Sequence, residues 1–167
     1  MAITSISQLK KLLEARIQKA LEQSRNEIYA VIKKHLVMYY QDKAFRGQTS
    51  NIPVEYDRTE RFLESLIKTK VVRVGNSLAC NVQLDEDYLD YKYPGNPERP
   101  DNVPATGLDV ATWANESSLY HTHGYTVPGT SSYDPWWDVA MEELGGKQGI
   151  LNIMKKNLKA VGIPLSK

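Results

Sequence analysis

Hydrophobic residues recur at helical spacing between Ser5 and Asp42, a stretch that contains neither proline nor glycine. They are Ile6, Leu9, Leu13, Ile17, Leu21, Ile28, Val31, Ile32, Leu36 and Tyr39. This spacing predicts one long helix, for which Ser5 or Ser7 is a suitable N-cap. Such a helix is about 55 Å long, whereas a compact domain of this size is about 40 Å across. We therefore expect it to overhang the body, to bend, or to pack on a neighbouring subunit.

A second helix is predicted from about Tyr56 to Ile67, after a loop at residues 43–55. Asp57 is its expected N-cap, and Glu60 follows at the spacing of a capping box. Its predicted apolar side consists of Phe62, Leu63, Leu66 and Ile67.

The next segment predicts a β-hairpin. Residues 70–74 and 77–84 are rich in β-branched residues, and Gly75-Asn76 separates them by the two residues that a tight turn needs. Cys80, Val82 and Leu84 alternate with polar residues, so we expect them to point to one face.

An acidic, tyrosine-rich stretch at residues 85–93 precedes an extended loop, residues 94–107, which holds four prolines and two glycines. Residues 108–116 fit either a short helix capped near Asp109 or a return to the sheet, and the pattern leaves both open. Asp134-Pro135 predicts the start of another helix, which Gly145-Gly146 ends. The last helix is expected at about residues 147–161, with its apolar side at Ile150, Ile153, Met154, Leu158 and Val161.

Together these elements predict an α+β fold. It has a long N-terminal helix and a small antiparallel sheet with a β-hairpin, packed by two or three further helices. We expect one domain overall, in which residues 1–54 form the long helix and a loop and residues 55–167 form the α+β body.

Composition and charge limit the classes of function that are compatible with the sequence. The 167 residues include no apolar run of 18, which speaks against a membrane span or a membrane partner. The first residues do not resemble a secretory signal, and a lone cysteine, Cys80, fits a reducing compartment. The net charge of +1 conceals a segregation, because residues 1–50 carry +5, residues 51–84 +1, residues 85–143 −10 and residues 144–167 +5. These surfaces either pair within one molecule or support head-to-tail association of copies.

Candidate chemistry is sparse, so we expect no catalytic residue, no cofactor and no metal. His121 and His123 alternate as metal ligands in a strand do, and Glu116, Asp134 and Asp138 are near enough in sequence to complete a site. Two histidines without a third spaced ligand are more simply polar loop residues. Cys80 is more simply a small buried residue than a nucleophile, and the acids at 85–87 resemble a solvated charge run. Walker A, G-x-G-x-x-G and G-x-S-x-G motifs are absent from the sequence.

Other residues are candidates for contact with a partner protein. Adjacent helical residues point about 100° apart, so Trp136 and Trp137 do not easily enter one core, and Trp is favoured at interfaces. Trp113 and the tyrosines at 88, 91 and 93 are interpreted in the same way. The full predicted interface comprises Leu9, Leu13, Ile17, Trp136, Trp137, Lys155, Lys156 and Lys159.

The order of three motifs resembles a known family. They are a helix that opens with Tyr56-Asp57-Arg58-Thr59, the hairpin at Gly75-Asn76, and His123-Gly124 ahead of Pro135-Trp136-Trp137. Over residues 55–161, with a gap, they resemble the head–tail joining or tail-completion proteins, minor tail proteins of the neck in long-tailed bacteriophages. The loop at 94–107 and the N-terminal helix are longer than that family usually carries.

The resemblance implies an α+β fold without catalysis. It also implies a homo-oligomeric ring, six-fold or twelve-fold, that contacts head-connector and tail proteins around the DNA channel without sequence-specific DNA binding. The location would be the virion, with synthesis in the bacterial host cytoplasm. The leading hypothesis is therefore a structural virion protein of the phage neck. Its alternatives are a small metal-dependent hydrolase using His121 and His123, and a nucleic-acid-binding helical module with a basic arm.

Overall fold

The computed structural model describes residues 5–41, 61–89, 92–93, 105–115 and 136–165. The helices are α1 (Ile6–Gln41), α3 (Arg61–Ser65), α4 (Gly107–Asn115), α6 (Trp136–Glu143) and α7 (Gly146–Ala160). The strands are β1 (Leu66–Lys68), β2 (Val72–Val74), β3 (Ser77–Ala79), β4 (Val82–Leu84), β5 (Lys92–Tyr93) and β6 (Ala105–Thr106). This is the predicted α+β fold, with a long N-terminal helix, a β-hairpin in small antiparallel sheets, and further helices packed on them.

The chain folds into two compact units. The first unit comprises Met1–Val31, Lys68–Gln83 and Glu143–Lys167, and the second comprises Ile32–Ile67 and Leu84–Glu142. Each unit is therefore built from segments that are distant in sequence. The predicted division between residues 54 and 55 stays a prediction.

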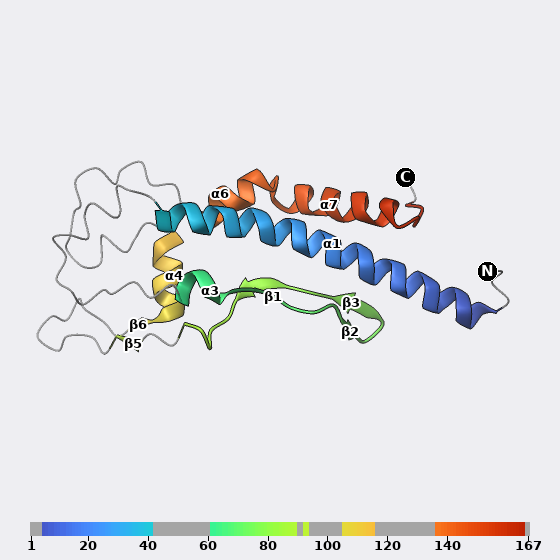
Figure 1. Ribbon diagram of the computed structural model, residues 1–167, viewed down its shortest axis with the longest axis horizontal. Coiled ribbons are helices and arrows are strands. Elements are labelled where there is room, and N and C mark those ends of the chain that lie inside the picture. The colour runs from blue at the N-terminus through green and yellow to red at the C-terminus, as the bar shows by residue number, and fades with distance from the viewer. Residues whose placement is uncertain (1–4, 42–60, 90–91, 94–104, 116–135, 166–167) are drawn as a thin grey trace, which may run out of the picture. The chain divides into compact units, whose positions relative to one another are not determined.

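Helix α1 confirms the long N-terminal helix, with 36 residues and a length of about 54 Å. The Ser5 hydroxyl accepts a hydrogen bond from the Gln8 amide at 3.2 Å, so Ser5 is the N-cap. In the first unit, α7 lies along one side of α1 and the β2–β3 hairpin lies on another (Figure 1). On the strand side, the Arg25 guanidinium donates to the Thr69 carbonyl at 2.6 Å.

The hairpin forms where the sequence predicts it. Val72 pairs with Ala79, and Val74 with Ser77, so Gly75 and Asn76 make the two-residue turn. Gly75 has a φ of +59°, which a residue with a side chain rarely adopts. The predicted second strand, 77–84, is interrupted at Cys80 and Asn81 before β4 begins, and β4 pairs with β1 instead.

The predicted helix from Tyr56 to Ile67 is wrong at its C-terminal end. Helix α3 stops at Ser65, and Leu66–Lys68 is strand β1. The Ser65 carbonyl accepts a hydrogen bond from the Asp85 amide at 2.7 Å, so the backbone joins β4 where the helix pattern would have continued. Leu66 is buried in the strand and was also expected on the apolar side of a helix, so its burial does not distinguish helical from strand spacing. The predicted caps, Asp57 and Glu60, lie outside the described residues.

Residues 105–115 settle one alternative and correct one expectation. Ala105 and Thr106 form β6, paired with β5, where the sequence predicts only loop up to residue 107. Residues 107–115 are helix α4, not a return to the sheet. The Asp109 carboxylate accepts hydrogen bonds from the amide and the hydroxyl of Thr106, both at 2.7 Å. This reciprocal cap makes Thr106 the N-cap and places Asp109 three residues into the helix.

The last helix is confirmed to within one residue at each end, as α7. Its C-terminus is a Schellman motif, in which the Gly162 amide donates to the Lys159 carbonyl and the Ile163 amide donates to the Leu158 carbonyl. Gly162 has the positive φ, 78°, that this motif requires. Helix α6 begins at Trp136, and the predicted cap at Asp134-Pro135 lies outside the described residues. Buried apolar residues are Ala20, Ile32, Leu36, Leu66, Ala111, Trp136, Ala140 and Leu144.

Candidate partner interface

The first three turns of α1 expose several large apolar side chains in succession. Ile6 is 88% exposed, Leu9 40% and Leu13 37%, whereas Leu36 in the same helix is 0% exposed. Large apolar side chains in a row are seldom left in water without a binding role. Figure 1 shows these turns extending past the hairpin and the end of α7.

These side chains line a groove of about 620 Å³, which we call the apolar groove. From α1 it is lined by Ile6, Leu9, Lys10, Leu13, Glu14 and Ile17, and from the hairpin by Arg73, Asn76, Ser77 and Leu78. The structure thus brings together Leu9, Leu13 and Ile17, three of the predicted interface residues. The hairpin wall was not predicted, because nothing in the sequence shows that the Gly75-Asn76 turn lies beside α1.

One ion pair crosses the apolar groove, from Arg73 on the hairpin to Glu14 on α1. Both side chains are partly exposed, so the pair contributes little to stability, about 0–1 kcal/mol. It neutralises the one acidic residue of the groove wall. Within the described residues no carboxylate pairs with Lys10, so the wall of the apolar groove keeps one uncompensated positive charge.

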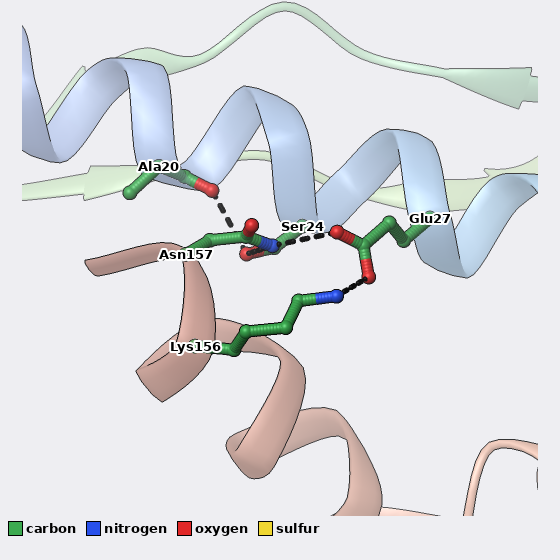
Figure 2. Close-up of polar contacts among 5 residues, drawn as sticks. All are labelled: Ala20, Ser24, Glu27, Lys156 and Asn157. Atoms are coloured by element: carbon green, nitrogen blue, oxygen red, sulfur yellow. Dashed lines mark hydrogen bonds and ion pairs between the residues drawn. The ribbon is translucent and has the colours of Figure 1, made fainter. Parts of the chain in front are cut away.

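The predicted lysines lie on α7, in the same unit, and they divide into two kinds. All three are exposed, but Lys156 pairs with the Glu27 carboxylate at 2.5 Å (Figure 2). Among the described residues no carboxylate pairs with Lys155 or Lys159. The Lys156 hydrogen bond is the largest of the effects that lower the pKa of Glu27 below its ordinary value. Lys156 therefore has an intramolecular role, and Lys155 and Lys159 remain as candidates for partner contact.

Beside this ion pair lies a buried polar cluster that was not predicted from the sequence. The Asn157 side-chain amide donates to the Ser24 hydroxyl and to the Glu27 carboxylate, both at 3.1 Å (Figure 2). Ser24 in turn donates to the Ala20 carbonyl at 2.8 Å. Asn157 and Ser24 are buried, and both donor hydrogens of the Asn157 amide are used. The cluster sets the lengthwise position of α7 against α1.

The predicted tryptophans lie in the second unit. Trp136 is buried in α6, and the Trp137 ring meets it edge-on, with ring centroids 5.6 Å apart and planes at 82°. Trp137 is half-buried. The two adjacent tryptophans thus differ in burial although their rings touch, and the predicted partner contact stays a prediction.

The comparison with known proteins rests on a family match. The sequence pattern of the YomN family matches residues 5–160. The chain belongs to the YomN family. This is a phage-derived family of the SPbeta-prophage type, so the protein is phage-associated. No curated protein and no solved structure matches the chain.

The YomN match runs from the N-cap of α1 to the last residue of α7. It therefore includes the apolar groove and the polar cluster, whereas the neck-protein resemblance began only at residue 55.

The alternative metal site gains no support from the described residues of this YomN-family chain. His121, His123, Glu116 and Asp134 lie outside them, and Asp138 is in α6. Elsewhere in the described ranges, no group of three His, Cys, Asp or Glu side chains is placed to hold a metal ion. Burial raises the pKa of the Cys80 thiol, which reduces its thiolate fraction. Among the described helices, none is long and apolar enough to cross a membrane.

Proposed function

We propose that this phage protein is a structural virion protein of the neck, which joins the head connector to the tail as part of a homo-oligomeric ring. The apolar groove is the observation that carries the proposal. Phage neck rings are held by contacts between subunits, and an exposed row of large apolar side chains beside a preformed wall suits such a contact. In this role the protein has no catalytic function and needs no cofactor.

The charge distribution supports association in a ring. A molecule with basic ends and an acidic middle places unlike charges opposite each other when copies are arranged head to tail. Head-to-tail contacts use two different surfaces on each copy and form a closed ring when the rotation between copies closes. The six-fold or twelve-fold symmetry and the contacts with head-connector and tail proteins belong to the same proposal. DNA would pass through the ring without sequence-specific binding.

The experiment that tests the proposal is localisation in phage particles. Particles from the source strain are purified, labelled with gold-conjugated antibody against this protein and viewed by electron microscopy. Label at the head–tail junction is the expected result. Label on capsids or tail tips would overturn the neck assignment but keep a virion protein. Particles that lack the protein by both labelling and mass spectrometry would overturn the virion assignment altogether.

A further inference from the structure

We propose that the apolar groove of one copy receives the turn Asp85–Tyr88 of a second copy, which we call the acidic turn. The inference rests on the proposed ring and deepens it by naming the two surfaces that meet. The occupant is chosen by charge, by exposure and by the preformed shape of the turn.

The apolar groove requires an occupant that is apolar at its centre and acidic at its edge. Its floor consists of leucine and isoleucine side chains, which gain free energy when they leave water, at about 25 cal/mol per Å². Residues 6–19 of α1 carry Lys10, Lys11, Arg16 and Lys19 against Glu14 alone. Because Glu14 is paired with Arg73, the positive charge of Lys10 at the groove is left for the occupant.

This charge argues against the simplest alternative within a homo-oligomer, in which two copies pair through α1 itself. Residues 6–19 have a net charge of +3, so two such helices side by side repel each other. The acidic middle of the chain has the opposite sign, with −10 over residues 85–143. A second copy therefore approaches the apolar groove most favourably with that part of its surface.

The acidic turn is the part of the acidic middle that has the required composition and is described. Tyr88 is 49% exposed, and Glu86 and Asp87 beside it are exposed as well. No described lysine or arginine pairs with Glu86 or Asp87. An exposed tyrosine beside two exposed acids thus matches a leucine-lined groove with Lys10 in its wall.

The acidic turn is also preorganised, which lowers the entropic cost of docking. The Asp85 carboxylate accepts a hydrogen bond from the Asp87 amide at 3.1 Å, and the Asp85 carbonyl accepts one from the Tyr88 amide at 3.2 Å. Tyrosine adds a large contact area at the cost of two side-chain torsions. Groove and turn are different surfaces of the molecule, so their contact is head to tail and continues from copy to copy.

Disulfide trapping with the full-length protein tests this contact. In a Cys80→Ser background, Leu13→Cys and Tyr88→Cys are made as separate variants, one of them carrying a mass tag. Oxidation of the mixture is expected to give a mixed Leu13→Cys/Tyr88→Cys dimer in large excess over either homodimer. Leu151→Cys replaces Tyr88→Cys in the control, because Leu151 is comparably exposed but lies on α7. Equal trapping by the control, or a dominant Leu13→Cys homodimer, would overturn the proposal.

A charge exchange provides a second measurement. Lys10→Glu alone or Asp87→Lys alone is expected to weaken association about tenfold in sedimentation velocity, because like charges then face each other. Mixing the two variants pairs Glu at position 10 of one copy with Lys at position 87 of the other and is expected to restore it. If the mixture does not regain the association of the wild-type protein, the proposed pairing of the groove with the acidic turn is contradicted.

Disulfide trapping in phage particles distinguishes failure of this docking contact from failure of the proposed neck function. It also tests the contact if the purified protein does not associate in solution. Particles are produced with the variant that carries Leu13→Cys, Tyr88→Cys and Cys80→Ser, and are then oxidised. Covalent multimers of this chain are the expected result. If the protein is present at the head–tail junction but forms no multimers, or is trapped on a different phage protein, the docking is wrong and the neck function stands. Absence of the wild-type protein from particles counts against the neck function itself.

Discussion

Two stretches of α1 carry similar apolar spacing and have opposite environments. In residues 6–17 the large apolar side chains lie in water or line the apolar groove, whereas Ala20, Ile32 and Leu36 further along are buried. The buried stretch also contains Ser24, held by Asn157 of α7. Amphipathic spacing therefore predicts that a helix face will be covered. Only the positions of α7 and the strands show which part of that face is covered within the same chain.

The strongest test of this difference is to replace leucine by alanine once in the buried stretch of α1 and once in the exposed stretch. Leu36→Ala is expected to lower the free energy of unfolding by about 3 kcal/mol, because it removes a fully buried side chain and leaves a cavity. Leu9→Ala is expected to change it by less than about 0.5 kcal/mol, because Leu9 is already exposed. Urea unfolding followed by circular dichroism measures both. Similar losses at the two positions would mean that the first turns of α1 are covered in the isolated chain.

The polar cluster is the next largest contributor. Asn157→Ala removes two hydrogen bonds to α1 and leaves the buried Ser24 hydroxyl without its donor, so a loss of about 2 kcal/mol is expected. Asn152→Ala is the matched control on the same helix, since Asn152 is exposed and bonds only locally to Gln148. Thermal unfolding of the two variants should separate them clearly. Equal melting temperatures would show that the cluster does not stabilise α7 on α1.

A smaller, pH-dependent contribution comes from the Glu27–Lys156 pair. The pKa of Glu27 is lowered from its ordinary value of 4.5, chiefly by the hydrogen bond from Lys156. A lowered pKa in the folded state adds stability that is present above 4.5 and is lost as the pH falls through the folded-state value. Since both side chains are substantially exposed, the contribution is below about 1 kcal/mol.

Glu27→Gln isolates this contribution, because it removes the charge and keeps an acceptor for Asn157. The difference in unfolding free energy between wild type and Glu27→Gln should be constant near neutral pH and shrink on acidification below 4.5. A difference that grows on acidification would contradict the lowered pKa.

The smallest expected change in stability belongs to the exposed lysines of α7. Lys155→Glu with Lys159→Glu is expected to change the free energy of unfolding by less than about 1 kcal/mol, because neither side chain is buried. In the proposed ring the same double variant should fail to assemble, since these lysines face acidic surfaces of a neighbour. Lys156 is left unchanged because it pairs with Glu27. Normal incorporation into particles would remove α7 from the subunit contact.

The sequence predicted the elements whose ends depend on local chemistry. The hairpin follows from Gly75-Asn76, and the end of α7 from Gly162, because both positions need a backbone that glycine supplies. Spacing alone predicts Leu9, Leu13 and Ile17 as interface residues, and this stays a prediction, although Leu9 and Leu13 are exposed and all three line the apolar groove.

Features that depend on distant segments were missed. The change from helix to strand at Leu66 is decided by pairing with β4, and the β5–β6 pair joins residues on either side of a proline-rich stretch. The polar cluster links Ser24 to a residue 133 positions later. Local propensity does not contain such information, because each partner taken alone looks like an ordinary polar residue in a helix.

The polar cluster has a consequence for synthesis on the ribosome. Glu27 emerges early, yet Lys156, its partner, is translated 129 residues later, a delay of roughly 10 s at common rates of elongation. During that interval the surface of α1 that α7 will cover is open to chaperones and to other nascent chains. Copies that are cut short before α7 never complete the first unit. Because the residues that line the apolar groove all belong to α1 and the hairpin, such a chain already carries the groove but lacks the helix that holds Ser24 and Glu27.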